Sequence, residues 1–142
     1  MHTLATQFAY VALIAVLMPA HGCQRDLVKA PYAGRQDMLS IRGYRDLAVE
    51  GRLHDVLVFS EPRIEAASEI RPMRVSVSVR SIHDPYGLSI QYQYTFYNNM
   101  MHEQSSTGWR FAHLPPRMQR HLEANALDST AVKYRLEVRS AR

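Results

Sequence analysis

The chain contains Met73-Arg-Val-Ser-Val-Ser-Val-Arg-Ser81, a short polar connection, and then Leu88-Ser-Ile-Gln-Tyr-Gln-Tyr-Thr-Phe-Tyr-Asn98. Both segments alternate apolar and polar residues with a period of two, which is the spacing of a β-strand that has one face in a core. The connection, His83-Asp-Pro-Tyr-Gly87, has proline and glycine at a spacing that is typical of turns. We therefore predict a β-hairpin over residues 73–98.

The two arms of this predicted hairpin each have an apolar face. It consists of Met73, Val75, Val77 and Val79 on the first arm and of Leu88, Ile90, Tyr92, Tyr94 and Phe96 on the second. A row of aromatic residues can form a stacking platform for sugar rings or bases. Here three of the four aromatic residues share the face of Leu88 and Ile90, so we interpret them as core, where tyrosine hydroxyls need hydrogen-bond partners. Tyr97 is the exception, because it falls on the polar face.

Other short segments with turn signals between them complete an all-β pattern. Pro62 indicates that the preceding strand lies at a sheet edge or ends there, since proline has no donor for a central ladder. The expected strands are 56–59, 109–112 with Trp109 and Phe111 on one face, 118–126 with Met118 and Leu122 on its apolar side, and 132–139 with Val132, Tyr134, Leu136 and Val138 inward. This pattern predicts a small antiparallel immunoglobulin-like β-sandwich over residues 53–142.

The beginning of the chain predicts export. Residues 8–20 are almost wholly apolar, too short to span a bilayer but of the length of a signal-peptide core. The following Ala20-His-Gly-Cys23 resembles a bacterial lipobox, in which a peptidase cuts before the cysteine and the cysteine carries the lipid. Ala20 stands where leucine is usual, and no Lys or Arg precedes the apolar segment. An ordinary cleaved signal and an uncleaved anchor are the alternatives.

Lipidation would give Cys23 a thioether-linked diacylglycerol and an amide-linked acyl chain such as palmitate, and two or more chains anchor a protein stably. Residues 1–22 would then be a signal peptide, and 23–52 the lipidated cysteine with a flexible tether. Leu39 with Ile41, or Leu47 with Val49, could add a short edge strand to the domain. Gln24 after the anchor, by resemblance to the enterobacterial sorting pattern, implies the periplasmic side of the outer membrane.

Composition and motifs argue against several classes of function. The net charge is +4 over 142 residues, and no run of basic residues forms an arm for nucleic acid. The histidines do not pair at metal-ligand spacing, and Cys23 is the only cysteine, so we expect no metal and no cofactor. Ser81, His83 and Asp84 are crowded into one predicted turn, where they cannot form a catalytic relay. We expect no enzyme.

The order of the strand residues is familiar. Ile90-Gln-Tyr-Gln-Tyr-Thr-Phe-Tyr-Asn98, Trp109-Arg110 and Ala131-Val-Lys-Tyr-Arg-Leu-Glu-Val-Arg139 resemble the corresponding segments of the YcfL family of bacterial envelope lipoproteins. The resemblance implies a sandwich-like fold in the cell envelope and no established enzyme activity. Members of that family are often encoded near activators of peptidoglycan synthases, which implies a partner in the cell-wall synthesis machinery.

These observations favour a lipid-anchored binding or scaffolding lipoprotein that docks an envelope protein. The polar face of the predicted hairpin is the expected contact surface, and it comprises Arg74, Arg80, Gln91, Gln93 and Tyr97. The alternatives are a purely structural envelope lipoprotein and a periplasmic wall-active enzyme or ligand binder.

Overall fold

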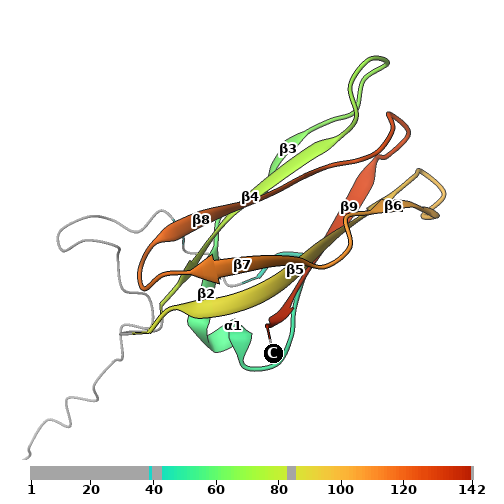
Figure 1. Cartoon of the computed structure of the whole chain (residues 1–142). Helices are drawn as coiled ribbons and strands as arrows, with labels where there is room; N and C mark the ends of the chain where they lie inside the picture. The colour runs from blue at the N-terminus through green and yellow to red at the C-terminus, as the bar shows by residue number, and fades with distance from the viewer. Residues whose placement is uncertain (1–38, 40–42, 83–85, 142) are drawn as a thin grey trace, which may run out of the picture.

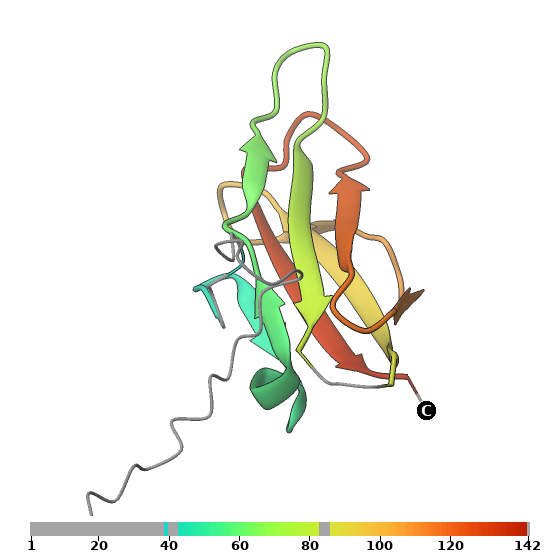
Figure 2. The same ribbon diagram turned by 90° about the vertical axis from the view of Figure 1, so that its left-hand side faces the viewer.

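The computed structural model describes residues 39, 43–82 and 86–141. They form two β-sheets packed face to face, which are seen one behind the other in Figure 2. The predictions for the signal peptide, for lipidation of Cys23 and for residues 83–85 of the turn lie outside the described residues. The predicted sandwich is confirmed.

Sheet A is built around β4 (Arg74–Ser81), which pairs with β8 (Gln119–Asn125) along one side. Its other side pairs with two short strands in succession, β2 (Leu57–Phe59) and β3 (Arg63–Glu65). Pro62 lies in the break between them, where the register against β4 shifts by one residue. This edge position agrees with the prediction for Pro62, because its missing N–H removes no central hydrogen bond.

Sheet B has β9 (Lys133–Ser140) and β5 (Leu88–Tyr97) at its centre, paired antiparallel. The far side of β5 pairs with β6 (Glu103–Ser106) and then with β7 (Arg110–Leu114). The far side of β9 pairs in parallel with β1 (Leu47–Val49), which realises one of the two expected edge strands within the range assigned to the tether. A four-residue helix, α1 (Leu53–Val56), leads from β1 to β2.

The predicted hairpin over residues 73–98 is wrong. Its two arms are the strands β4 and β5, but β4 belongs to sheet A and β5 to sheet B, so they face each other across the core (Figure 1). Alternation indicates which face of a strand is buried, and it carries no information about which strand lies alongside. Each arm forms a long antiparallel ladder with another strand of its own sheet: β4 pairs with β8, and β5 pairs with β9.

The inner faces of both sheets are as predicted. Val75, Val77 and Val79 of β4 and Ile90, Tyr94 and Phe96 of β5 are fully buried in one core. Two residues expected on apolar faces, Met118 and Val132, are exposed instead. Both lie just outside a strand, where the loop and not the pleat decides the direction of a side chain.

The strand order differs from that of an immunoglobulin domain. Among the described residues there are seven strands in chain order, if β2/β3 and β6/β7 are each counted as one interrupted strand. The second, third and sixth then form sheet A, and the first, fourth, fifth and seventh form sheet B. An immunoglobulin constant domain groups the first, second, fourth and fifth against the other three. The two folds therefore share the sandwich architecture and differ in topology.

Candidate functional site

The predicted contact surface is divided by the fold. Arg74 lies on the outer face of sheet A, whereas Gln91, Gln93 and Tyr97 lie on the outer face of sheet B, on the other side of the molecule. Arg80 is only 1% exposed. The prediction of one common surface is wrong, because it assumed that β4 and β5 are neighbours. The prediction of an exposed Arg80 is also wrong, because alternation does not show whether other residues cover an outward position.

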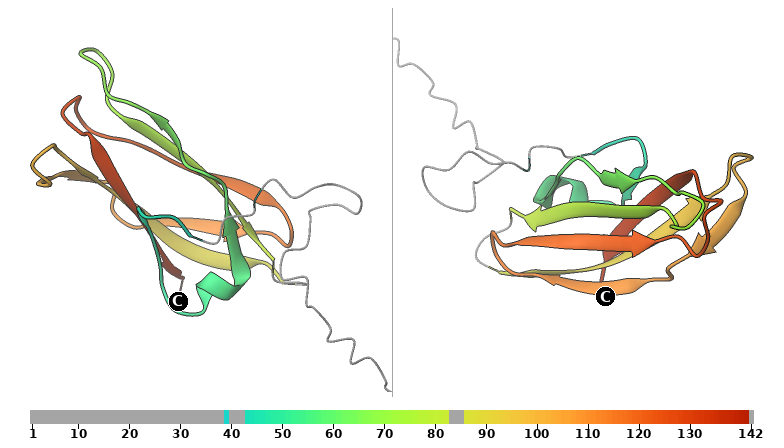
Figure 3. Two further views of the ribbon diagram at one scale, coloured as in Figure 1. Left: turned by 180° about the vertical axis from the view of Figure 1, so that it is seen from behind. Right: turned by 90° about the horizontal axis from the view of Figure 1, so that it is seen from above.

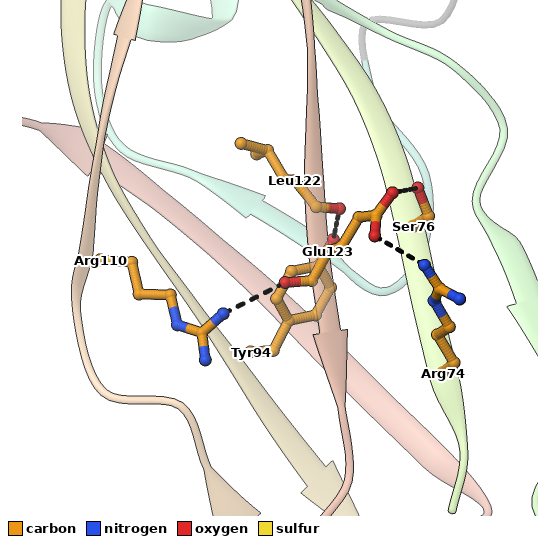
Figure 4. Close-up of polar contacts among 6 residues, drawn as sticks. All are labelled: Arg74, Ser76, Tyr94, Arg110, Leu122 and Glu123. Carbon is orange, nitrogen blue, oxygen red and sulfur yellow. Dashed lines mark hydrogen bonds and ion pairs between the residues drawn. The ribbon is translucent and has the colours of Figure 1, made fainter.

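On the outer face of sheet A, Arg74 belongs to a cross-strand network with β8 (Figure 4). Its Nη2 donates to Oε2 of Glu123 at 2.8 Å, and Ser76 Oγ donates to the other carboxylate oxygen at 3.4 Å. The bond and the charge of Arg74 lower the pKa of Glu123 below its ordinary value. Arg74 and Glu123 are both well exposed, so this pair is a solvated surface contact.

A serine–histidine contact lies on the same face. Ser78 Oγ is 3.0 Å from Nδ1 of His121, and Gln119 Nε2 donates to the same Oγ. A hydrolytic relay needs an acid that orients the histidine. The carboxylate two residues along β8, Glu123, is instead engaged by Arg74 and Ser76. The arrangement is a polar ladder across the exposed surface of a sheet.

The side of the sandwich between β7 and β8 is closed by two bonds that cross from sheet B to sheet A. The buried Tyr94 hydroxyl donates to the carbonyl of Leu122 at 2.8 Å, and Arg110 Nη1 donates to the carbonyl of Glu123 at 3.3 Å (Figure 4). These bonds join β8 to sheet B in addition to its ladder with β4.

One end of the sandwich is open. A cavity of about 510 Å³ lies there between β1, β3 and the beginning of β9. Its lining combines apolar and polar side chains, and its charged members are three cations and one acid. The lining residues are Arg45, Asp46, Leu47, Ala48, Ile64, Met73, Tyr97, Met101, Val132, Lys133, Tyr134 and Arg135. We call this region the open end.

Exposed apolar side chains surround the open end. The β3–β4, β5–β6 and β8–β9 connections all meet at this end of the molecule (Figure 3, left). Together with β3 they expose Ile64, Ile70, Met100, Met101, Leu127 and Val132. Water-exposed apolar clusters of this kind mark interaction sites more often than isolated apolar residues do.

The β5–β6 turn holds Met101 in an unusual backbone conformation. Its φ is +64°, which side chains other than glycine rarely adopt. The Asn98 side chain sustains this turn, because its Oδ1 accepts from the backbone N–H groups of both Met100 and His102. Local strain that is retained where a side chain meets solvent is a common property of binding sites.

Trp109 and Phe111, to which the sequence analysis assigned no function, belong to a cluster on the surface of the protein. Trp109 and Phe111 share a face as expected, but that face is the outer surface of sheet B, where they are 41% and 64% exposed. The guanidinium of Arg139 lies 3.7 Å from the centre of the Trp109 ring, and its Nε donates to Oε1 of Gln91 at 2.9 Å. The position of Leu114 in the sequence could have predicted that Trp109 and Phe111 face outward. As the apolar end of β7 it must point inward, which directs the residues of opposite parity outward.

Over residues 39, 43–82 and 86–141, no helix is both long and apolar enough to cross a membrane. Within the same ranges no group of three or more His, Cys, Asp or Glu side chains is placed to hold a metal ion.

No protein-family model and no curated protein matches the chain. Two solved structures are similar to it in fold. One is a member of the DUF1425 family from Shewanella sp. pv-4, with 24% identity and a TM-score of 0.52, covering 61% of this chain and 79% of the other. The second is Campylobacter jejuni cj0090, with 14% identity and a TM-score of 0.58, covering 68% of this chain and 98% of the other. At these identities the similarity shows that the chain shares its β-sandwich fold with a DUF1425 protein.

Proposed function

We propose that this protein is a lipid-anchored binding or scaffolding lipoprotein of the bacterial cell envelope. Cys23 attaches it to the periplasmic side of the outer membrane, and the open end docks an envelope protein. The lipobox resemblance of residues 20–23 supports the anchor. The resemblance to the YcfL family supports the compartment and a partner in the cell-wall synthesis machinery. No catalytic step is part of the proposal.

The observation that carries the proposal is the exposed apolar cluster around the cavity of the open end. Keeping such side chains in water is unfavourable by about 25 cal/mol for each Å² of apolar surface, so a partner that covers them gains free energy. Arg45, Lys133 and Arg135 outnumber the single acid of the lining. A partner surface that combines apolar side chains with acidic groups would be complementary to it.

Two methionines provide a matched test of this docking site. Met101 at the open end is 55% exposed, and Met118, which precedes β8 at the other end of the sandwich, is 56% exposed. The experiment is a cross-linking pull-down from intact membranes with the full chain. We expect Met101→Glu to reduce recovery of the partner at least tenfold, because a carboxylate repels an acidic surface. Met118→Glu should leave recovery unchanged, and equal recovery with both variants would contradict the docking site.

The anchor is tested in the same cells with Cys23→Ala. We expect this variant to move from the membrane to the soluble periplasmic fraction, because no acyl chain would hold it. If Cys23→Ala fails to restore the envelope function that a deletion strain lacks, while Met101→Glu restores it fully, a purely structural lipoprotein is favoured over a docking protein.

A further inference from the structure

The outer face of sheet B carries an exposed aromatic surface that the docking site does not use. Trp109 is the only tryptophan of the chain. It immediately precedes β7 and is partly exposed, as is Phe111 of that strand, on the outer face of sheet B. Cross-strand pairing places Phe111 beside Gln91, and Gln91 beside Arg139. The result is a row of planar side chains across three neighbouring strands.

Arg139 is held in a fixed position within this row. The Trp109 ring covers one face of its guanidinium, and Gln91 accepts its Nε–H. Among the described residues, no side chain or carbonyl accepts from its two Nη groups. Four N–H donors of a preoriented guanidinium are thus available to a ligand, at little further cost in side-chain entropy.

Hydrogen-bond acceptors lie next to these donors. Trp109, Arg139, Glu50 and Glu137 line one hollow of about 300 Å³. Glu50 and Arg139 also line a second hollow of about 320 Å³, together with Gln91 and Ser140. An aromatic ring therefore lies beside both donors and acceptors, a combination that suits a ligand with one apolar face and many hydroxyl groups.

The charge of the site selects among such ligands. Glu137 is paired with Arg135 outside the hollow of Trp109, at 3.4 Å, and Glu50 is matched by Arg139 within it. The hollow therefore has no excess of positive charge that would favour a phosphate or an acidic sugar. A neutral pyranose ring has a C–H face that stacks on an indole and hydroxyl groups at its rim. We infer that the Trp109 face of sheet B is a binding site for a neutral pyranose oligosaccharide, with Phe111 as a second aromatic surface along the chain of rings.

The single tryptophan makes a direct test possible. The full chain is titrated with cellohexaose, with the hexamer of N-acetylglucosamine and with hexagalacturonate, while Trp109 emission and its quenching by iodide are followed. We expect a saturable blue shift and at least twofold protection from iodide with one or both neutral oligomers. A response to the N-acetylated oligomer alone would identify amino-sugar glycans as the ligand. A response to both would identify neutral glycans in general.

Variants of the site distinguish oligosaccharide binding from changes in Trp109 emission that have another cause. Glu137→Gln and Arg139→Lys should each weaken saturable binding at least tenfold, because the first loses a charged acceptor and the second the planar pair of donors. Glu123→Gln removes an exposed carboxylate from the opposite face and should bind as the native chain does. Failure of both neutral oligomers to saturate, tighter binding of hexagalacturonate, or native affinity in both sheet B variants would overturn the inference. The docking site at the open end would be unaffected by these outcomes.

Discussion

The Tyr94 hydroxyl shows how one polar group can join the two sheets. Its ring lies in the core beside Phe96 and Tyr134, and its oxygen donates to the carbonyl of Leu122 in the opposite sheet. Burial raises the pKa of Tyr94 well above its ordinary value, so the hydroxyl remains a donor over the physiological range. A buried tyrosine with its partner satisfied adds both apolar packing and a directional bond.

Tyr94→Phe is expected to lower the free energy of unfolding by about 0.5–1.5 kcal/mol, because the bond from Tyr94 to the Leu122 carbonyl across the core would be lost. Urea unfolding of the full chain measures this difference. Tyr92→Phe is the matched control, since Tyr92 is only half-buried and its hydroxyl makes no hydrogen bond to any described residue. Equal stability of the two variants would show that the bond contributes little.

Single residues also show the limit of prediction from sequence. The pleat gives the direction of a side chain correctly for Val77 and Tyr94, which are buried as expected. The pleat does not show whether other residues cover an outward-pointing side chain, because that depends on the rest of the fold. Arg80 is therefore buried although it was predicted to lie on a contact surface, whereas Trp109, whose environment the pattern left undefined, is part exposed.

Strands were more predictable than their partners. The segments that form β4, β5 and β9 are evident from their alternation, because each has an unbroken apolar face. Pairing depends on which strands lie alongside in three dimensions, and the adjacent arms 73–81 and 88–98 proved to lie in different sheets. The predicted contact surface was wrong for this reason, because it took its residues from both arms.

Close packing where β5 begins explains why position 87 is occupied by glycine. A Cβ at this position would lie 2.7 Å from two ring atoms of His113 and 3.1 Å from the Leu114 carbonyl oxygen of β7. We expect Gly87→Ala to displace the His113 ring, to break its contact with Ser89 Oγ, now 3.1 Å from Nδ1, and to cost about 1–3 kcal/mol of stability.

The measurement for Gly87→Ala is urea unfolding together with the NMR signals of the His113 ring. Gly43→Ala serves as the control, because its new Cβ would have its nearest neighbour, Cε1 of His54, at 4.0 Å. Unchanged stability and an unmoved His113 ring in Gly87→Ala would mean that β5 and β7 can separate slightly without loss.

The two proposed binding regions were beyond prediction for a common reason. The open end is assembled from three connections far apart in the sequence, and the Trp109 face from β1, β5, β7 and β9. Neither has a local motif, since each of its residues has an ordinary role within its own strand or turn. The packing of the two sheets places the exposed apolar loops together. The strand order within sheet B sets Arg139 against Trp109.

Two buried tyrosines, Tyr94 and Tyr134, and the partly buried Tyr44 make the stability of the whole sandwich sensitive to alkaline pH. Burial raises the pKa of Tyr134 to about 12, and it raises the pKa of Tyr44 and Tyr94 as well. In the unfolded chain these hydroxyls ionise near pH 10, so above that pH the unfolded state loses protons first. The contribution of Tyr134 to stability is therefore complete below about pH 10 and is lost as the pH rises through 12. The contributions of Tyr44 and Tyr94, whose pKa values are raised further, continue to fall at higher pH.

Urea unfolding at a series of pH values tests this dependence. We expect the free energy of unfolding to be flat up to about pH 10 and then to fall by about 1.4 kcal/mol per pH unit for each tyrosine that remains protonated only in the folded state. Tyr134→Phe removes one such group, so its curve should fall less steeply between pH 10 and 12. A native curve that stays flat to pH 12, or a variant curve of the same slope, would contradict a role for these hydroxyls. It would imply that water reaches them within the folded sandwich.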